Sequence, residues 1–172
     1  EQVWKVGGMY SPAIEKIVYW LQKASEVALG HSCDEALPYY VSLKHRFKDN
    51  PYFLYNYAAV FTEAKEYEKA LKVALECRKY WADYDLELLL GDIYREKKDY
   101  KQAEEYYMSA SYMCPSRFLP LYQLYELYKC IGNTEKASEL AKILLEKPAK
   151  VNSMLIKRIK YQLKKECELL IL

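Results

Sequence analysis

Apolar residues recur every three or four positions in paired segments of this chain, with polar residues between them. That spacing follows one face of a 3.6-residue helix, so each pair of segments predicts two amphipathic helices. The pairs repeat with a fixed period, marked by small residues at Ala36, Ala70, Ala103 and Ala137, at intervals of 34, 33 and 34 residues. A period of this size predicts stacked helical hairpins, because one hairpin cannot bury its apolar face alone.

The third repeat carries the pattern most fully. It combines small residues that let helices approach with large residues that fill the gaps beside them, namely Leu90, Gly91, Tyr94, Ala103, Tyr107, Ala110 and Pro115. This combination resembles the tetratricopeptide repeat, over roughly residues 12 to 147. The resemblance implies an all-α fold, a right-handed α-α superhelix (tetratricopeptide-like solenoid) with about four helix hairpins and a C-terminal closing helix.

We expect one tetratricopeptide-like domain over residues 1–172. The repeats are predicted at about 12–48, 51–83, 84–116 and 118–149, and the closing helix at 152–170. The pattern is broken by Lys23 in the first repeat, Ala74 in the second and Tyr125 in the fourth. Atypical terminal repeats are expected, because they cap the core. Since the chain starts at Glu1 and not at a methionine, we also expect it to be part of a longer polypeptide.

The composition favours a packed interaction domain without metal or disulfide chemistry. The sequence contains 19 tyrosines, and we expect most of them at the aromatic packing positions of the repeats. The five cysteines are odd in number and form no Cys-x-x-Cys pair, which speaks against a disulfide framework and against a zinc site. Cys77 falls at a small-residue position, so we expect it to be buried.

The sequence predicts no catalytic site. His31 and His45 are the two histidines, and neither stands in a metal-ligand or catalytic-triad spacing. The Gly7-Gly8 pair lacks the Lys-Ser/Thr sequence that a phosphate-binding loop requires. We therefore predict a domain that is not an enzyme and that uses neither a cofactor nor a metal.

Positive charge is concentrated near the C-terminus. Of the 26 lysine and arginine residues, seven lie between positions 147 and 165, where no acidic residue occurs. This segment is predicted as an amphipathic helix, and its apolar stripe is Ile156, Ile159, Leu163 and Cys167. One interpretation is a helix that covers the apolar face of the last repeat.

The other interpretation is a basic surface that meets anionic lipid or an acidic glycan. Its candidate residues are Lys157, Arg158, Lys160 and Lys164. Nucleic acid is a third alternative, which we disfavour because aromatic stacking residues are not interleaved with these lysines.

The first helix of each hairpin lines the concave face of a tetratricopeptide stack, so the resemblance points to candidate binding residues. By register they are Tyr52, Tyr55 and Asn56 in the second repeat, Asp92 in the third, and Tyr122, Gln123 and Glu126 in the fourth. Some members of the family clamp a C-terminal carboxylate, but here Leu119 and Gln123 occupy the basic positions of that clamp. Tyrosine, amide and acid side chains together can bind an extended peptide or a sugar chain. An empty, solvated face is the alternative.

Four segments form a more particular pattern, namely Asn50–Ala59, Asp83–Leu86, Ala110–Tyr122 and Leu127–Lys129. Together they are similar to the C-terminal repeat region of some bacterial O-antigen ligase or polymerase family proteins, over about residues 46 to 160. The resemblance implies a soluble appendage, on the periplasmic side, of a membrane enzyme that handles lipid-linked polysaccharide. It carries over no catalytic residue, because catalysis in that family resides in the membrane part.

The functional expectation is a non-catalytic scaffold module in cell-envelope glycan assembly. Its partner would be a protein or peptide, with polysaccharide or its assembly machinery as a further class, and nucleic acid is not expected. Membrane association would come through segments outside these 172 residues. The alternative is a free-standing adaptor that binds an extended segment of another protein, and in that case we expect a cytoplasmic location.

Overall fold

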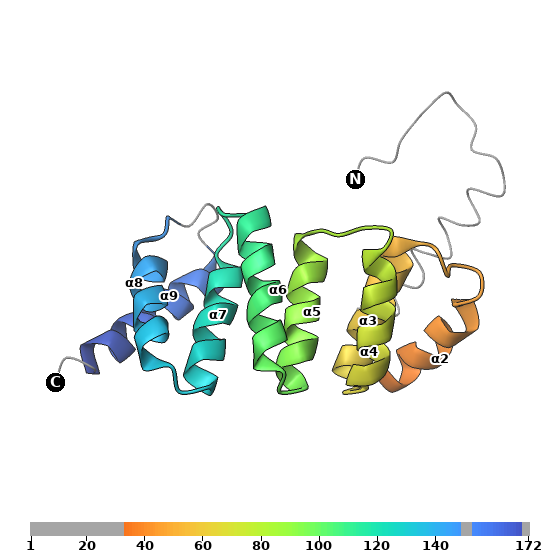
Figure 1. Cartoon of the computed structure of the whole chain (residues 1–172), viewed down its shortest axis with the longest axis horizontal. Coiled ribbons are helices and arrows are strands. Elements are labelled where there is room, and N and C mark those ends of the chain that lie inside the picture. The colour runs from red at the N-terminus through yellow and green to blue at the C-terminus, as the bar shows by residue number, and fades with distance from the viewer. Residues whose placement is uncertain (1–32, 149–152, 170–172) are drawn as a thin grey trace, which may run out of the picture. The chain divides into compact units, whose positions relative to one another are not determined.

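The computed structural model describes residues 33–148 and 153–169 (Figure 1). The chain divides into two compact units, with the boundary between Tyr80 and Trp81. The described residues form eight α-helices and no strand, as the hydrophobic period predicts. The first helix predicted for the first repeat lies outside the described residues.

The first unit contains the helices α2 (Cys33–Leu43), α3 (Pro51–Glu63) and α4 (Tyr67–Arg78). Helix α3 packs against both α2 and α4. Aromatic rings fill the contact between α2 and α3, where the ring centroid of Tyr40 lies 5.5 Å from that of Tyr57 and 5.2 Å from that of Phe53. Cys77 on α4 is fully buried, and its Sγ donates to the Pro51 carbonyl oxygen at 3.3 Å. The predicted burial of Cys77 is confirmed.

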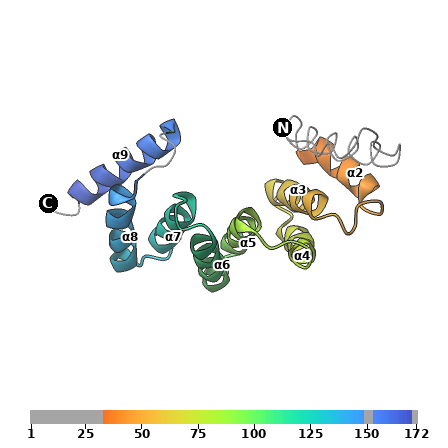
Figure 2. The same cartoon turned by 90° about the horizontal axis from the view of Figure 1, so that it is seen from above.

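The second unit contains α5 (Tyr84–Glu96), α6 (Tyr100–Met113), α7 (Leu119–Cys130), α8 (Thr134–Glu146) and α9 (Met154–Leu169). Each helix packs against the next one along the chain, and Figure 1 shows α5 to α8 side by side. Helix α9 has a different orientation, since Figure 2 shows α5 and α6 nearly end-on but α9 along its length. None of the described helices is both long enough and apolar enough to span a membrane.

Side-chain caps explain where most of these helices begin. The side chains of Asn50, Asp83, Asp99 and Asn133 each accept a hydrogen bond from the backbone N–H three residues ahead, at 2.9, 2.9, 3.3 and 3.1 Å. The Ser153 hydroxyl accepts the corresponding bond at the start of α9, at 3.3 Å. Such caps satisfy N–H groups of the first turn that have no partner within the helix. These helix starts are therefore local consequences of Asn, Asp and Ser.

The three hairpins α3–α4, α5–α6 and α7–α8 each contain the same type of turn. Lys65, Lys98 and Gly132 adopt left-handed φ values of 60°, 63° and 74°. In each turn the N–H of this residue bonds to the carbonyl three residues back, and the next N–H bonds to the carbonyl five residues back. This pair of bonds is the Schellman motif, which satisfies carbonyl groups at the end of a helix. The first helix of each hairpin is therefore joined to the second in the same way.

The contact between α5 and α6 depends on Gly91. A Cβ atom at this position would lie 2.4 Å from Cε1 of Tyr107, which is much shorter than a normal contact between carbon atoms. The fully buried Tyr107 ring therefore packs directly against the backbone of α5. Ala103 and Ala110, one turn away on either side along α6, are also fully buried. This is the combination of small and large residues on which the repeat prediction rests.

Helix α9 completes the core of the second unit. Ile159 and Leu163 are buried in the same cluster as Leu144 of α8, and Ile156 packs against that cluster. The predicted closing helix is confirmed by these three residues of its stripe, whereas the side chain of Cys167 lies outside the described residues.

Candidate functional site

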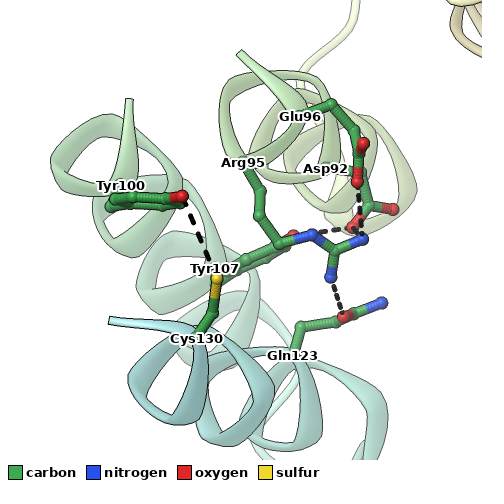
Figure 3. A network of polar contacts seen from close by, with 7 residues as sticks. All are labelled: Asp92, Arg95, Glu96, Tyr100, Tyr107, Gln123 and Cys130. Carbon is green, nitrogen blue, oxygen red and sulfur yellow. Dashed lines mark hydrogen bonds and ion pairs between the residues drawn. The ribbon is translucent and has the colours of Figure 1, made fainter. Parts of the chain in front are cut away.

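Polar side chains on α5 and α7, joined by one from α6, form the candidate site (Figure 3). Arg95 on α5 is at its centre, and its Nη1 donates to Oε1 of Gln123 on α7 at 2.9 Å. The Nη2 of Arg95 lies 3.8 Å from Oδ1 of Asp92 and 3.5 Å from Oε1 of Glu96. The Tyr107 hydroxyl on α6 donates to Oδ1 of Asp92 at 2.6 Å. These five residues are called the Arg95 network below.

The local sequence explains how the network is placed. Asp92 and Arg95 are three residues apart, so both lie on the same face of α5. Tyr107 reaches Asp92 because Gly91, the preceding residue, lets the tyrosine ring approach the α5 backbone. The network therefore joins two predicted site residues, Asp92 and Gln123, through an arginine that lies between them.

Burial dominates the electrostatics of the network. The pKa of Asp92 is raised above its ordinary value of 3.8, because desolvation outweighs the Tyr107 hydrogen bond and the nearby Arg95 charge. Burial, together with the Asp92 carboxylate, also raises the pKa of Tyr107, which keeps that hydroxyl protonated as a donor. The side chains of Arg95 and Asp92 are still 28 % and 33 % exposed. The network is thus anchored in the protein and stays partly accessible to solvent.

Tyr122 and Glu126 extend the site along α7. The ring centroid of Tyr122 lies 6.1 Å from that of Tyr125 and 6.4 Å from that of Phe118, in stacked arrangements. Burial raises the pKa of Tyr122, and the Glu126 carboxylate raises it further. Both side chains are half-buried. One turn of α7 therefore presents an aromatic ring, the Gln123 amide and a carboxylate.

The three candidate residues of the second repeat lie on α3, in the first unit. Tyr52 is exposed, whereas Tyr55 and Asn56 are half-buried. The Asn56 side-chain amide donates to the Tyr52 carbonyl oxygen at 2.8 Å, so it is held against its own helix. A continuous binding face from α3 to α7 stays a prediction, since it would extend over both units.

Sequence reasoning did not identify Arg95 as a site residue, and it assigned Tyr107 to packing alone. A signal for Arg95 exists in the sequence, because an acid and a base three residues apart form a common ion pair on a helix. The bond to Gln123 has no local signal, since the two residues are 28 positions apart. At the edge of the same region, Sγ of Cys130 lies 3.9 Å from the Tyr100 hydroxyl oxygen (Figure 3).

Two other tyrosine–carboxylate contacts join helices of the second unit. Glu104 on α6 accepts from the Tyr128 hydroxyl at 2.5 Å and from Lys136 at 3.0 Å. The Tyr128 hydrogen bond is the main reason that the pKa of Glu104 is lowered. Glu166 on α9 accepts from the Tyr125 hydroxyl of α7. The first contact links α6 to α7 and the second links α9 to α7, so we assign both to stability.

The basic residues of α9 have different roles. Lys157, Arg158 and Lys164 are exposed. Lys160 is half-buried, and its Nζ donates to the carbonyl oxygens of Leu145 at 2.9 Å and Lys147 at 2.7 Å. These carbonyls lie at the C-terminal end of α8, where a helix leaves carbonyl groups without partners. The fourth candidate of the basic surface therefore also ties α9 to α8.

The chemistry that the described side chains offer is hydrogen bonding and ion pairing. Residues 33–148 and 153–169 contain no group of three or more His, Cys, Asp or Glu side chains that could hold a metal ion. Of the two histidines, His45 is exposed and His31 lies outside the described residues. The Arg95 network combines a guanidinium, carboxylates, a phenol and an amide, which together can donate to and accept from a bound polypeptide.

No protein-family model matches this sequence, and no curated protein matches it. Among solved structures, the chain is similar to the one described as "Crystal structure of MamA", with a TM-score of 0.62 and 14 % sequence identity. The match covers 69 % of this chain and 70 % of that one. MamA is a helical-repeat protein of the tetratricopeptide-like kind, and at this identity the likeness concerns the fold alone. The predicted fold class is thereby confirmed, and the chain is an all-α protein built from tetratricopeptide-like helical repeats.

Proposed function

We propose that this chain is a non-catalytic interaction module that holds an extended segment of a partner protein against α5 and α7. The Arg95 network is the observation that carries the proposal. Its guanidinium is fixed between the first helices of two neighbouring hairpins, yet the Arg95 and Asp92 side chains stay partly exposed. Polar groups that are already ordered lose little conformational entropy when a partner binds.

The charges of this surface favour a basic partner segment. Asp92, Glu96 and Glu126 outnumber the two basic residues of this stretch of α5 and α7, Arg95 and Lys129. Since Arg95 is paired with two of these carboxylates, the surface carries a net negative potential. Tyr122 is half-buried, so part of its phenol stays available to the apolar stem of a lysine or arginine side chain.

A capture experiment tests the proposal. The purified chain is crosslinked in an envelope fraction and in a soluble fraction of its host, and the captured proteins are identified. Tyr122→Ala/Gln123→Ala removes two of the three α7 side chains of the site. Tyr112→Ala, which truncates an exposed tyrosine of α6, is the control. We expect one partner with a basic segment to be lost from the double variant and retained by the control. Equal capture by both variants would contradict a site on α5 and α7.

We further propose that the module is the soluble appendage of a membrane polysaccharide ligase or polymerase. There it would assemble or position the machinery of envelope-glycan synthesis on the periplasmic side. The support is the similarity of the four segments within residues 46 to 160 to that family's C-terminal repeat region. A phosphatase reporter fused within the full-length gene tests the placement. Reporter activity outside the cytoplasm is the expected result, and cytoplasmic placement would end this version of the proposal.

The alternative is a free-standing adaptor for an extended protein segment, unrelated to glycans. The Arg95 network could bind a partner segment in either the appendage or the adaptor. The gene sequence upstream of Glu1 therefore distinguishes the two proposals. Several hydrophobic spans encoded upstream of Glu1 favour the appendage, whereas a start codon directly upstream favours the adaptor.

A further inference from the structure

One exposed face of α9 alternates apolar and basic side chains. Its members are Met154, Lys157, Arg158, Tyr161, Lys164 and Lys165, all of them exposed. Each apolar member lies three or four residues from the basic members nearest to it, so the six side chains share one face of the helix. Met154 is 79 % exposed and Tyr161 61 %, so both side chains are available at the surface of the helix. We call these six residues the α9 stripe.

No ion pair with a described side chain neutralises the positive charge of the α9 stripe, and the side chain of Glu168, four residues after Lys164, lies outside the described residues. No acidic residue occurs between positions 147 and 165. Glu166, which follows, is turned to α7, where it accepts from the Tyr125 hydroxyl and from Lys129. Lys165 lies over the Tyr161 ring, with Nζ 5.2 Å from the centroid. Four positive charges therefore surround two exposed apolar side chains.

We propose that the α9 stripe docks this chain on an anionic membrane surface. Lysine and arginine side chains near such a surface are attracted by the lipid phosphates. Moving exposed apolar side chains from water into the headgroup boundary lowers the free energy further. Tyr161, with an apolar ring and a polar tip, suits that boundary. A dissolved polyanion would use the charges but would leave Met154 in water, so the apolar members favour lipid. This surface is independent of the Arg95 network.

The docking helix is already folded before it meets lipid. The opposite face of α9 buries Ile159 and Leu163, and Lys160 is tied to the end of α8. An isolated amphipathic helix inserts its apolar face into the bilayer. In α9 that face is already packed in the protein core. Binding is therefore shallow, leaves the helix content unchanged and weakens as salt screens the charges.

The test is co-sedimentation of the 172-residue chain with phosphatidylcholine vesicles, with and without phosphatidylglycerol. Lys157→Gln/Lys164→Gln removes two charges of the stripe, and Lys101→Gln/Lys142→Gln removes two exposed charges on α6 and α8 as the matched control. We expect binding only to the anionic vesicles, weaker by about fivefold for each stripe charge removed. Binding by the control stays at the wild-type level. Equal weakening by both variants would overturn the proposal.

A second variant separates lipid from other polyanions. Met154→Ser/Tyr161→Ser keeps every charge, so we expect weaker binding to anionic vesicles but unchanged binding to heparin. Vesicle binding that this variant leaves unchanged would show a purely electrostatic contact and overturn the membrane assignment. So would a rise in helix content by circular dichroism when vesicles are added. All substituted side chains are exposed, and the melting temperature of each variant verifies that it is folded.

Discussion

Gly91 serves both packing and the candidate site. Its missing side chain lets the Tyr107 ring lie on the backbone of α5, and the hydroxyl of the same tyrosine donates to Asp92. Asp92 in turn lies beside Arg95, which reaches α7 through Gln123. A position that the repeat explains by packing alone therefore also orients a polar network.

We expect Gly91→Ala to lower the free energy of unfolding by about 1–3 kcal/mol, because the added Cβ collides with a fully buried ring. Helix propensity alone predicts the opposite sign, since alanine is better than glycine by about 1 kcal/mol inside a helix. Urea unfolding measures the difference. The double variant Gly91→Ala/Tyr107→Leu should lose less unfolding free energy than the two single variants lose together, because the two side chains are in contact. An unfolding free energy that stays the same or rises in Gly91→Ala would show that the register of α5 against α6 is wrong.

Asp92→Asn tests the electrostatics of the network. Burial raises the pKa of Asp92 above 3.8, so the folded state binds this proton more tightly than the unfolded chain does. The wild type should therefore lose stability relative to Asp92→Asn as the pH rises from 3.8 through the raised pKa, and the difference should level off above it. Unfolding free energies of both proteins across this range measure the effect. A wild type that gains relative stability with rising pH would contradict the dominance of burial.

The left-handed residues of the hairpin turns have predictable costs. Gly132→Ala should lower the free energy of unfolding by about 1–2 kcal/mol, because a residue with a Cβ is strained at a positive φ. A Cβ there would meet no atom from elsewhere in the chain within 4 Å, so the cost comes from the local backbone conformation alone. Lys98→Gly should stabilise by about 0.5–1 kcal/mol for the same reason. Thermal unfolding measures both changes, and shifts of the same sign would show that the two turns differ.

At the scale of the helix, Lys160 is the clearest test of how α9 is attached. Lys160→Met keeps the apolar stem but removes two hydrogen bonds to the end of α8, so we expect a loss of about 1–2 kcal/mol. Lys164→Met, at an exposed position of the same helix, should change stability by less than about 0.5 kcal/mol. Denaturant unfolding measures both, and amide exchange should become faster in α9 for the first variant only. Equal effects would mean that the Lys160 bonds contribute nothing.

The helices themselves were predictable because their signals are local. Asn50 and Asp83 begin α3 and α5 as side-chain caps, and the three- and four-residue spacing of apolar residues marks the buried faces. The bond from Arg95 to Gln123 and the bonds from Lys160 to α8 were not predictable. They depend on which side chains face each other across separate helices, and a repeat pattern does not specify this for polar positions.

At the scale of the whole molecule, the second unit has a core of its own. The cluster that runs from Leu88 to Leu163 draws all its buried residues from α5 to α9 and the connections between them. Repeat proteins are stabilised mainly by contacts between neighbouring repeats. We therefore expect a fragment of residues 81–172 to be helical by circular dichroism and to unfold cooperatively. A gradual, non-cooperative melt would show that this core needs the preceding hairpin.

The turn shared by the three hairpins bears on how such a chain changes in evolution. A duplicated stretch of about 34 residues would bring its own left-handed residue and its own pair of backbone bonds, so the new hairpin would close like its parent. One residue inserted into a turn would instead break both bonds and rotate the second helix away from the first. A long duplication in the gene is thus easier to accommodate than the insertion of a single codon.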